Sequence, residues 1–191
     1  MNYKCRSLST DEFRKIITAI KTGFVHEGTR VHPNERIATI LTVEGNLGIR
    51  ISDVLALHLS DIVKDGDRYR LSITEIKTGK PRNFTVPLEI YNYLQTYAYE
   101  NGISKESKLF DLGKRVVQQH LDKTCRYLGI HGVSTHSFRK YFATQVYVES
   151  GYNVELVREL LQHSSVTTTQ RYIGVGSKEI EEALQKRVLL V

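Results

Sequence analysis

The sequence predicts an α+β fold that is mostly α-helical and carries a small antiparallel sheet of about three strands. Apolar residues recur at every third or fourth position over most of the 191 residues, which is the period of an amphipathic helix. Between residues 69 and 86 the period changes to two, because Tyr69, Leu71 and Ile73 alternate with polar residues. The apolar share of 40% and the charged share of 25% are ordinary for a globular protein with a buried core.

The N-terminal region predicts a helix, a loop and a second helix. Ser9 and Glu12 form the pattern of a capping box, and apolar residues at helical spacing follow it. Residues 23–33 contain glycine and proline and are interpreted as a loop. Asn34 is a good N-cap, so a second helix is expected directly after that loop.

Glycines and turn sequences mark the passage from this second helix to the sheet. We expect Gly45 and Gly48 to break the helix, and Ser52 to cap a short third helix. The turn sequences that follow are KDGD at residues 64–67 and KTGK at residues 77–80. Because these turns separate the alternating segments, they predict antiparallel hairpins.

After the sheet the chain is predicted to be helical again. The expected helices cover residues 88–100, 114–128, 136–149, 154–162 and 177 to the C-terminus. No internal repeat, low-complexity segment or clear linker interrupts this pattern. We therefore expect residues 1–191 to form one domain.

Charge and cysteine content limit the classes of partner. The formal net charge of +6 favours a polyanionic partner. Cys5 and Cys125 fit no metal-binding pattern and suggest no disulfide framework. No apolar run approaches the roughly 20 residues that span a bilayer, and the N-terminus has no signal-peptide pattern. We therefore expect an intracellular, cytoplasmic protein without membrane contact.

Two arginines stand at expected helix starts, where backbone N–H groups favour an anion. Arg50 lies between Ile49 and Ile51, and it is either a surface arginine beside a cap or a phosphate ligand. His136 and Arg139 are three residues apart, so on a helix they share a face. That face is either a solvated polar surface or a site where both side chains and the helix dipole meet a phosphate.

Three further polar residues have both a structural and a functional interpretation. Lys77 lies at a hairpin tip, where lysines are common, and it could grip DNA backbone together with the neighbouring Lys64, Lys80 and Arg82. A histidine that follows an apolar helix, such as His163, is usually structural. Tyr172 follows Gln170 and Arg171 and lies outside any apolar pattern, which is unusual for a core tyrosine.

The order of these groups resembles the catalytic domain of the tyrosine recombinases, the phage integrase family. The segment LGIRISDVLALHLSDI resembles the family's first arginine box, and KTGK resembles its lysine hairpin. THSFRKYFAT resembles the second box, and LLQHSSVTTTQRYI resembles the box with a histidine and the nucleophilic tyrosine. The resemblance covers roughly residues 7–173 and implies the tyrosine recombinase catalytic-domain fold.

The resemblance also implies a role for each candidate residue. Tyr172 would attack a DNA phosphate and form a covalent 3′-phosphotyrosine. Arg50 and Arg139 would clamp the non-bridging oxygens, because a planar guanidinium binds two oxygens at once. His163 would donate a further hydrogen bond to the phosphate.

Two groups would move protons in this reaction. His136 would assist proton transfer and hold the phosphate, and Lys77 would protonate the departing 5′ oxygen. No metal or cofactor is needed, because the arginines supply the positive charge. The 3′-phosphotyrosyl bond stores the energy for rejoining, so no ATP is needed.

The function implied is site-specific recombination, the integration or excision of mobile DNA by strand cleavage and rejoining. The implied partner is double-stranded DNA, on which four copies assemble, whereas the chain without DNA is expected to be a monomer associated with the nucleoid. Family members usually carry an N-terminal DNA-clamping domain, which we expect to be absent from this chain. Two alternatives stay open: relaxation of DNA like that of a type IB topoisomerase, and a non-catalytic DNA-binding module.

Overall fold

The computed structural model describes residues 5–174, so the helix expected from Ser177 onward lies outside the described residues. The chain divides into two compact units, residues 1–142 and 143–191. The boundary falls within helix α6 (Thr135–Glu149). Each unit is described by itself below.

The first unit begins with helices α1 (Thr10–Thr22) and α2 (Glu35–Leu47), which contact each other. The capping box of α1 is confirmed, since the Ser9 hydroxyl accepts the Glu12 amide at 3.1 Å and the Glu12 carboxylate accepts the Ser9 amide at 2.9 Å. The Asn34 side chain caps α2 by accepting the Ile37 amide at 3.0 Å. Both helix starts therefore follow the local sequence.

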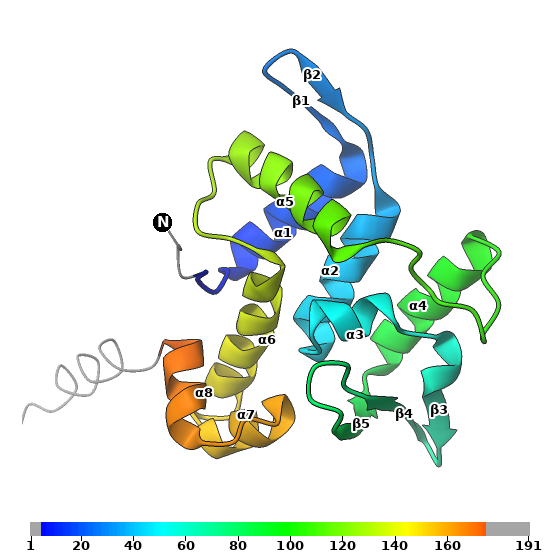
Figure 1. Cartoon of the computed structure of the whole chain (residues 1–191), viewed down its shortest axis with the longest axis vertical. Helices are drawn as coiled ribbons and strands as arrows, with labels where there is room; N and C mark the ends of the chain where they lie inside the picture. The colour runs from blue at the N-terminus through cyan, green and yellow to red at the C-terminus, as the bar shows by residue number, and fades with distance from the viewer. Residues whose placement is uncertain (1–4, 175–191) are drawn as a thin grey trace, which may run out of the picture. The chain divides into compact units, whose positions relative to one another are not determined.

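The segment between these helices is a hairpin, and its interpretation as a loop was wrong. Strands β1 (Phe24–His26) and β2 (Thr29–Val31) pair antiparallel across Glu27 and Gly28. Both turn residues have positive φ, 48° and 72°, which is the geometry of a tight two-residue hairpin turn. Figure 1 shows this hairpin projecting past the ends of α1 and α2.

The two glycines of α2 behave differently from each other. Gly48 ends the helix in the left-handed conformation, with φ 58°, as expected. Gly45 does not break the helix but lies within it, where a side chain would collide with the ring of Phe13. The short helix α3 (Ile51–Leu55) has Arg50 at its N-cap position and Ser52 within it, so the expectation that Ser52 caps it was also wrong.

The predicted three-stranded antiparallel sheet is confirmed. A single 3-10 turn, η1 (Leu59–Asp61), leads into strands β3 (Ile62–Asp65), β4 (Arg68–Thr74) and β5 (Pro81–Val86), in that spatial order. Helix α4 (Leu88–Glu100) contacts β4, and Tyr91 of α4 stacks on Tyr69 of β4 with ring centroids 3.8 Å apart. Figure 1 shows this sheet and α4 at the opposite end of the unit from the β1–β2 hairpin.

Helix α5 (Lys114–Leu128) and the start of α6 complete the first unit. α5 contacts α1 and α3, and buries Val117 and Leu121. The ring of Phe138 in α6 is fully buried, with its centroid 5.4 Å from that of Phe13. The apolar stripe of α6 thus anchors the helix that carries two of the candidate catalytic residues.

The second unit contains the end of α6 and the short helices α7 (Val154–Leu161) and α8 (Val166–Ile173). α7 ends at Gln162, which has a left-handed φ of 55°. The Ser165 hydroxyl then caps α8 by accepting the Thr168 amide at 3.2 Å. The tight turn between these helices fixes the segment that carries His163 and Tyr172.

Candidate active site

Arg139 is buried in the first unit, although it stands on a polar stretch of sequence. Its side chain is 1% exposed, and its Nη1 donates to the carbonyl oxygen of Gly48 at 2.6 Å. A side chain at Gly48 would collide with the ring of Phe142, so glycine lets the end of α2 approach α6 closely. The interpretation of Arg139 as part of a solvated helix face was therefore wrong.

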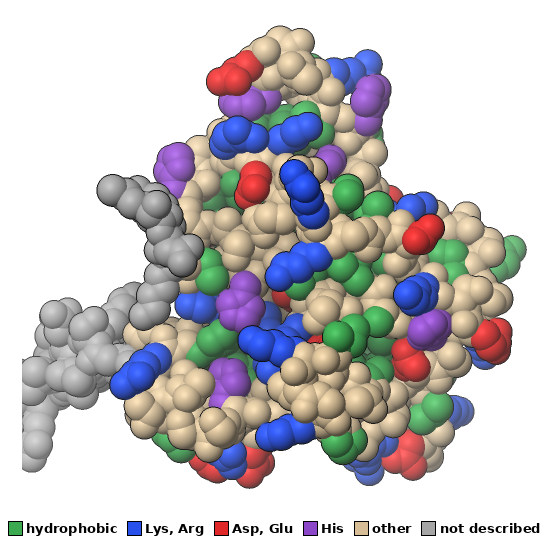
Figure 2. Space-filling model, viewed as in Figure 1, with side chains coloured by type: hydrophobic (Ala, Val, Ile, Leu, Met, Phe, Trp, Pro, Cys, Tyr) green, Lys and Arg blue, Asp and Glu red, His purple; other side chains and the backbone are tan. Residues whose placement is uncertain are grey.

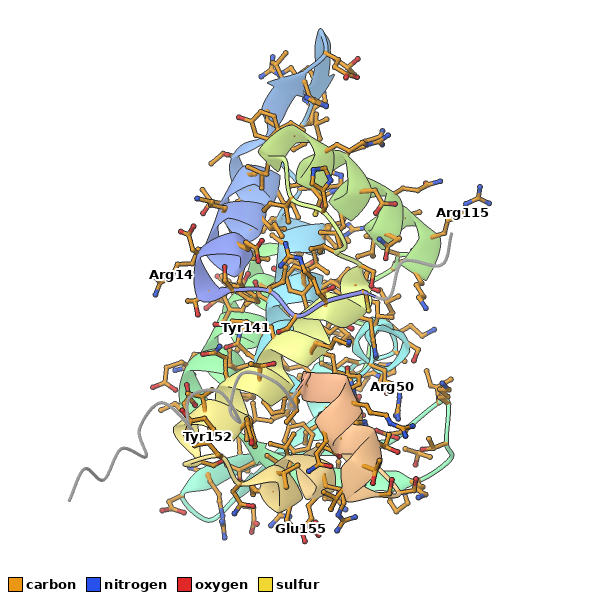
Figure 3. The ribbon with its side chains drawn as sticks, turned by 90° about the vertical axis from the view of Figure 1, so that its left-hand side faces the viewer. Arg14, Arg50, Arg115, Tyr141, Tyr152 and Glu155 are labelled. Carbon is orange, nitrogen blue, oxygen red and sulfur yellow. The ribbon has the colours of Figure 1, made fainter. Side chains whose placement is uncertain are left out.

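Arg50 occupies the N-cap position of α3 and forms an ion pair with Glu75, between its Nη1 and the Oε2 of the carboxylate. The Arg50 side chain is 19% exposed, whereas Glu75 is fully buried. Figure 3 shows Arg50 at the start of α3, on the side where the loop between β4 and β5 lies. A simple surface arginine does not pair with a buried carboxylate, so that interpretation is excluded.

Arg82 joins these two arginines into one cluster, which sequence reasoning missed. Its Nη1 donates to Oε1 of Glu75 at 3.0 Å, and its Nη2 reaches the Gly48 carbonyl oxygen at 3.4 Å. The side chain is 3% exposed, so the expectation that Arg82 grips DNA backbone from the surface was wrong. Burial lowers the pKa of Arg82 to about 10, and the charges of Arg139 and Arg50 act in the same direction.

The two acidic groups beside this cluster, Glu75 and Glu44, differ in whether they are ionised. Burial would raise the pKa of Glu75, but hydrogen bonds from Arg50, Thr78 and Arg82 hold it at about 2. Burial raises the pKa of Glu44 well above its usual range, although the charge of Arg139 acts against this. Two guanidinium groups thus bind one ionised carboxylate, and the third, that of Arg139, shares the Gly48 carbonyl with Arg82. This excess of positive charge favours the binding of an anion.

Lys77 lies in the exposed turn between β4 and β5. The turn is closed by two backbone hydrogen bonds, from the Glu75 amide to the Lys80 carbonyl at 2.9 Å and from the Gly79 amide to the Glu75 carbonyl at 2.8 Å. The Lys77 side chain is therefore carried by the same loop that holds the buried carboxylate of Glu75.

His136 lies in the first turn of α6 and has an exposed side chain, in contrast to Arg139. The pKa of His136 is lowered to about 4. Neighbouring protein atoms that displace water from the imidazole are the largest cause, and the positive charges of Arg139, Lys140, Arg50 and Lys114 act in the same direction. The imidazole is thus neutral at physiological pH in the DNA-free chain. A neutral imidazole can accept a proton or donate an N–H bond without adding charge.

The second unit brings His163 and Tyr172 together. Their ring centroids are 5.1 Å apart in an edge-to-face arrangement. The His163 Nδ1 lies 3.0 Å from the hydroxyl oxygen of Thr169, and the His163 carbonyl accepts Nη1 of Arg158 at 3.1 Å. These contacts fix the imidazole beside α8, the short helix that carries Tyr172.

The candidate residues thus fall into two groups. Arg50, Arg139, His136 and Lys77 belong to the first unit, and His163 and Tyr172 belong to the second. Figure 2 shows Lys and Arg side chains spread along the face of the first unit, with fewer Asp and Glu side chains among them. Among residues 5–174, no group of three His, Cys, Asp or Glu side chains could hold a metal ion, and no helix is long and apolar enough to span a membrane.

Residues 6–179 of this chain match a family model whose description is "Phage integrase family". The chain belongs to the phage integrase family. The match includes every candidate residue, from Arg50 to Tyr172.

Curated relatives of this family member are named tyrosine recombinases. The chain is 28% identical over 193 residues to tyrosine recombinase XerA of Pyrococcus furiosus, which covers 97% of this chain and 63% of that protein. It is also 28% identical to tyrosine recombinase XerC of Caldanaerobacter subterraneus, over 95% of this chain and 51% of that protein. The chain therefore spans less than two thirds of the length of these relatives.

Solved structures of a recombinase and of an integrase share the fold. A XerA recombinase structure covers 100% of this chain and 66% of its own chain, with a TM-score of 0.69 and 22% identity. The catalytic domain of bacteriophage HP1 integrase covers 96% of this chain and 95% of its own, with a TM-score of 0.66 and 19% identity. These similarities confirm the predicted tyrosine recombinase catalytic-domain fold.

Proposed function

We propose that this chain is a recombinase catalytic domain that cuts and rejoins double-stranded DNA in site-specific recombination, with Tyr172 as the nucleophile. Tyr172 would attack the scissile phosphorus and form a 3′-phosphotyrosine, and the 5′ oxygen would leave with a proton. A 5′-hydroxyl of the partner strand would then attack the phosphotyrosine, release Tyr172 and reseal the DNA. The relatives' names as tyrosine recombinases support this activity.

The arginine cluster is the observation that carries the proposal. Arg50 and Arg82 bind one ionised carboxylate, Glu75, and Arg139 joins them through the Gly48 carbonyl that it shares with Arg82, so the cluster has an excess of positive charge. A DNA phosphate supplies the missing negative charge. Guanidiniums held in place before the reaction stabilise the charge that builds up on the non-bridging oxygens, without reorganising at the moment of attack.

The remaining candidates have roles that fit their surroundings. His163 is fixed by Thr169 beside Tyr172 and would donate a hydrogen bond to the phosphate. His136, neutral in the free chain, would take part in proton transfer from the Tyr172 hydroxyl. Lys77, exposed in its turn, would protonate the leaving 5′ oxygen.

The finer parts of the proposal concern assembly and biological setting. The chain would act as a tetramer on DNA and be a monomer without it, in the cytoplasm with the nucleoid. Its DNA would be that of a mobile element, a role supported by the description of the matching family as phage integrases. Topoisomerase-like relaxation is the less favoured alternative, because the curated relatives are recombinases.

The test is covalent trapping on a pool of nicked duplexes of random sequence. We expect the wild-type chain to form adducts, and sequencing of the trapped DNA then identifies its site. Mass spectrometry should map the adduct to Tyr172. The Tyr172→Phe variant should keep its circular dichroism spectrum and its duplex affinity but form no adduct. An adduct on Tyr147 or Tyr152 would contradict the assignment.

A further inference from the structure

Glu75 binds two of the three arginines of the cluster and lies in the loop between β4 and β5. It is fully buried, although the residues on either side of it in this loop are exposed. Neither the motif KTGK nor the arginine box contains it. A carboxylate buried in such a polar loop costs free energy unless several donors satisfy it.

The donors that satisfy Glu75 come from three places. Arg50 approaches Oε2 from the start of α3, and Arg82 donates to Oε1 from β5 at 3.0 Å. The Thr78 hydroxyl donates to Oε2 at 2.7 Å from within the loop itself. Because Thr78 is the residue next to Lys77, one carboxylate joins the Arg50 guanidinium to the turn that carries the candidate general acid.

The bond to Glu75 determines the orientation of Arg50 more than that of the other two donors. Arg82 has a second acceptor in the Gly48 carbonyl, and it is buried. Arg50 is partly exposed and makes no side-chain capping bond to α3, so its ion pair with Glu75 sets its orientation. A planar guanidinium bound to a carboxylate through Nη1 keeps its other N–H groups for an incoming phosphate.

We propose that Glu75 is a positioning residue, which fixes the plane of the Arg50 guanidinium so that it meets the scissile phosphate in the reactive orientation. This inference rests on the proposed function, because it assigns the reacting phosphate to Arg50. Glu75 itself does not touch DNA. Its effect on cleavage therefore passes through Arg50.

A double-mutant cycle tests this pathway on the duplex recovered by trapping. Single-turnover cleavage is measured for Glu75→Gln, Arg50→Ala and the double variant. We expect Glu75→Gln to slow cleavage by about 100-fold, as a misplacement of roughly 1 Å can do, with duplex affinity unchanged. In the Arg50→Ala background, Glu75→Gln should have no further effect, since residues that act through one contact are not additive.

Two controls separate positioning from loss of the fold. Asp65→Asn removes an exposed ion pair with Arg70, at 3.6 Å, from the same sheet, and should cleave at the wild-type rate. Glu75→Asp keeps the charge, and it should restore part of the rate that Glu75→Gln loses. On a duplex with an uncharged methylphosphonate at the scissile position, the Glu75→Gln defect should shrink, because less charge needs to be neutralised.

The outcomes distinguish this inference from the proposed function. If the wild-type chain forms no adduct with any duplex, the proposed function fails. The positioning of Arg50 by Glu75 is then tested without DNA cleavage, by the Nε–Hε signal of Arg50 in ¹⁵N-arginine NMR spectra. We expect that signal to shift and broaden in Glu75→Gln, and to respond less to added inorganic phosphate. An unchanged Arg50 signal, or an equal slowing by Glu75→Gln in the wild-type and Arg50→Ala backgrounds, overturns the inference.

Discussion

At the scale of single residues, Glu44 shows how the site tolerates a buried acid. It is fully buried in α2, and its oxygens make no hydrogen bond of good geometry within residues 5–174. Burial raises the pKa of Glu44 well above its ordinary value of 4.5, although the charges of Arg139 and Lys114 and the Ile51 amide favour the ionised form. The group is therefore protonated in the folded chain at pH values where the unfolded chain has lost the proton.

This linkage predicts a stability change with a definite sign. Because the folded pKa is raised, the contribution of Glu44 to the free energy of unfolding falls as the pH rises above about 4.5. Glu44→Leu should remove this dependence and stabilise the chain at pH 8 by on the order of 1–3 kcal/mol. Urea unfolding at pH 5 and pH 8 measures the free energy of unfolding of the wild type and of Glu44→Leu, with Glu44→Gln as a second variant. A loss of roughly 3–5 kcal/mol would instead mean an ionised Glu44 paired with Arg139.

At the scale of elements, the contact between the end of α2 and α6 depends on Gly48. Gly48→Ala places a side chain in a left-handed backbone with φ 58° and against the Phe142 ring, so it should cost about 2–4 kcal/mol. The matched control is Gly66→Ala in the β3–β4 turn, where φ is 64° and no atom lies within 4 Å. That change should cost only about 1 kcal/mol. If Gly48→Ala and Gly66→Ala lose the same free energy of unfolding in urea, the contact with the Phe142 ring is not important.

The β4–β5 turn gives a second prediction at this scale, which concerns Lys77 as the general acid. A duplex with a 5′-bridging phosphorothiolate has a leaving group that needs no proton. We expect Lys77→Ala to cleave the ordinary duplex at least about 100-fold more slowly than wild type and to regain most of the rate on the phosphorothiolate. Lys80→Ala, in the same exposed turn, is the control. If Lys77→Ala stays equally slow on both duplexes, Lys77 positions DNA and is not the acid.

At the scale of the whole molecule, the net charge of +6 predicts DNA binding that weakens steeply with salt. Binding that neutralises roughly four phosphates should lose about 100-fold in affinity between 50 and 200 mM salt. Fluorescence anisotropy with a labelled duplex of arbitrary sequence measures the slope. Lys77→Ala should make the dependence of affinity on salt less steep, by the contribution of about one phosphate contact. A slope near zero would rule out phosphate contacts as the source of affinity.

The sequence by itself determined the local features of this protein. Caps at Ser9 and Asn34 and the change of period at the sheet are short-range patterns, and the order of six polar residues from Arg50 to Tyr172 can be read along the chain without the fold. They predicted the mostly helical fold and the three-stranded sheet. The hairpin at residues 23–33 was missed because a Glu-Gly turn is a weaker signal than Asn-Gly or Asp-Gly.

Only the tertiary structure decided which polar side chains are buried and what they bind. Arg139 and the Gly48 carbonyl lie 91 residues apart in sequence, and Arg82 and that same carbonyl lie 34 apart. Nothing in the polar loop around Glu75 marks it as fully buried. A local pattern reports the period of one element, whereas burial of a charge depends on donors that distant elements bring to it. The arginine cluster and its carboxylate could therefore be found only in the folded chain.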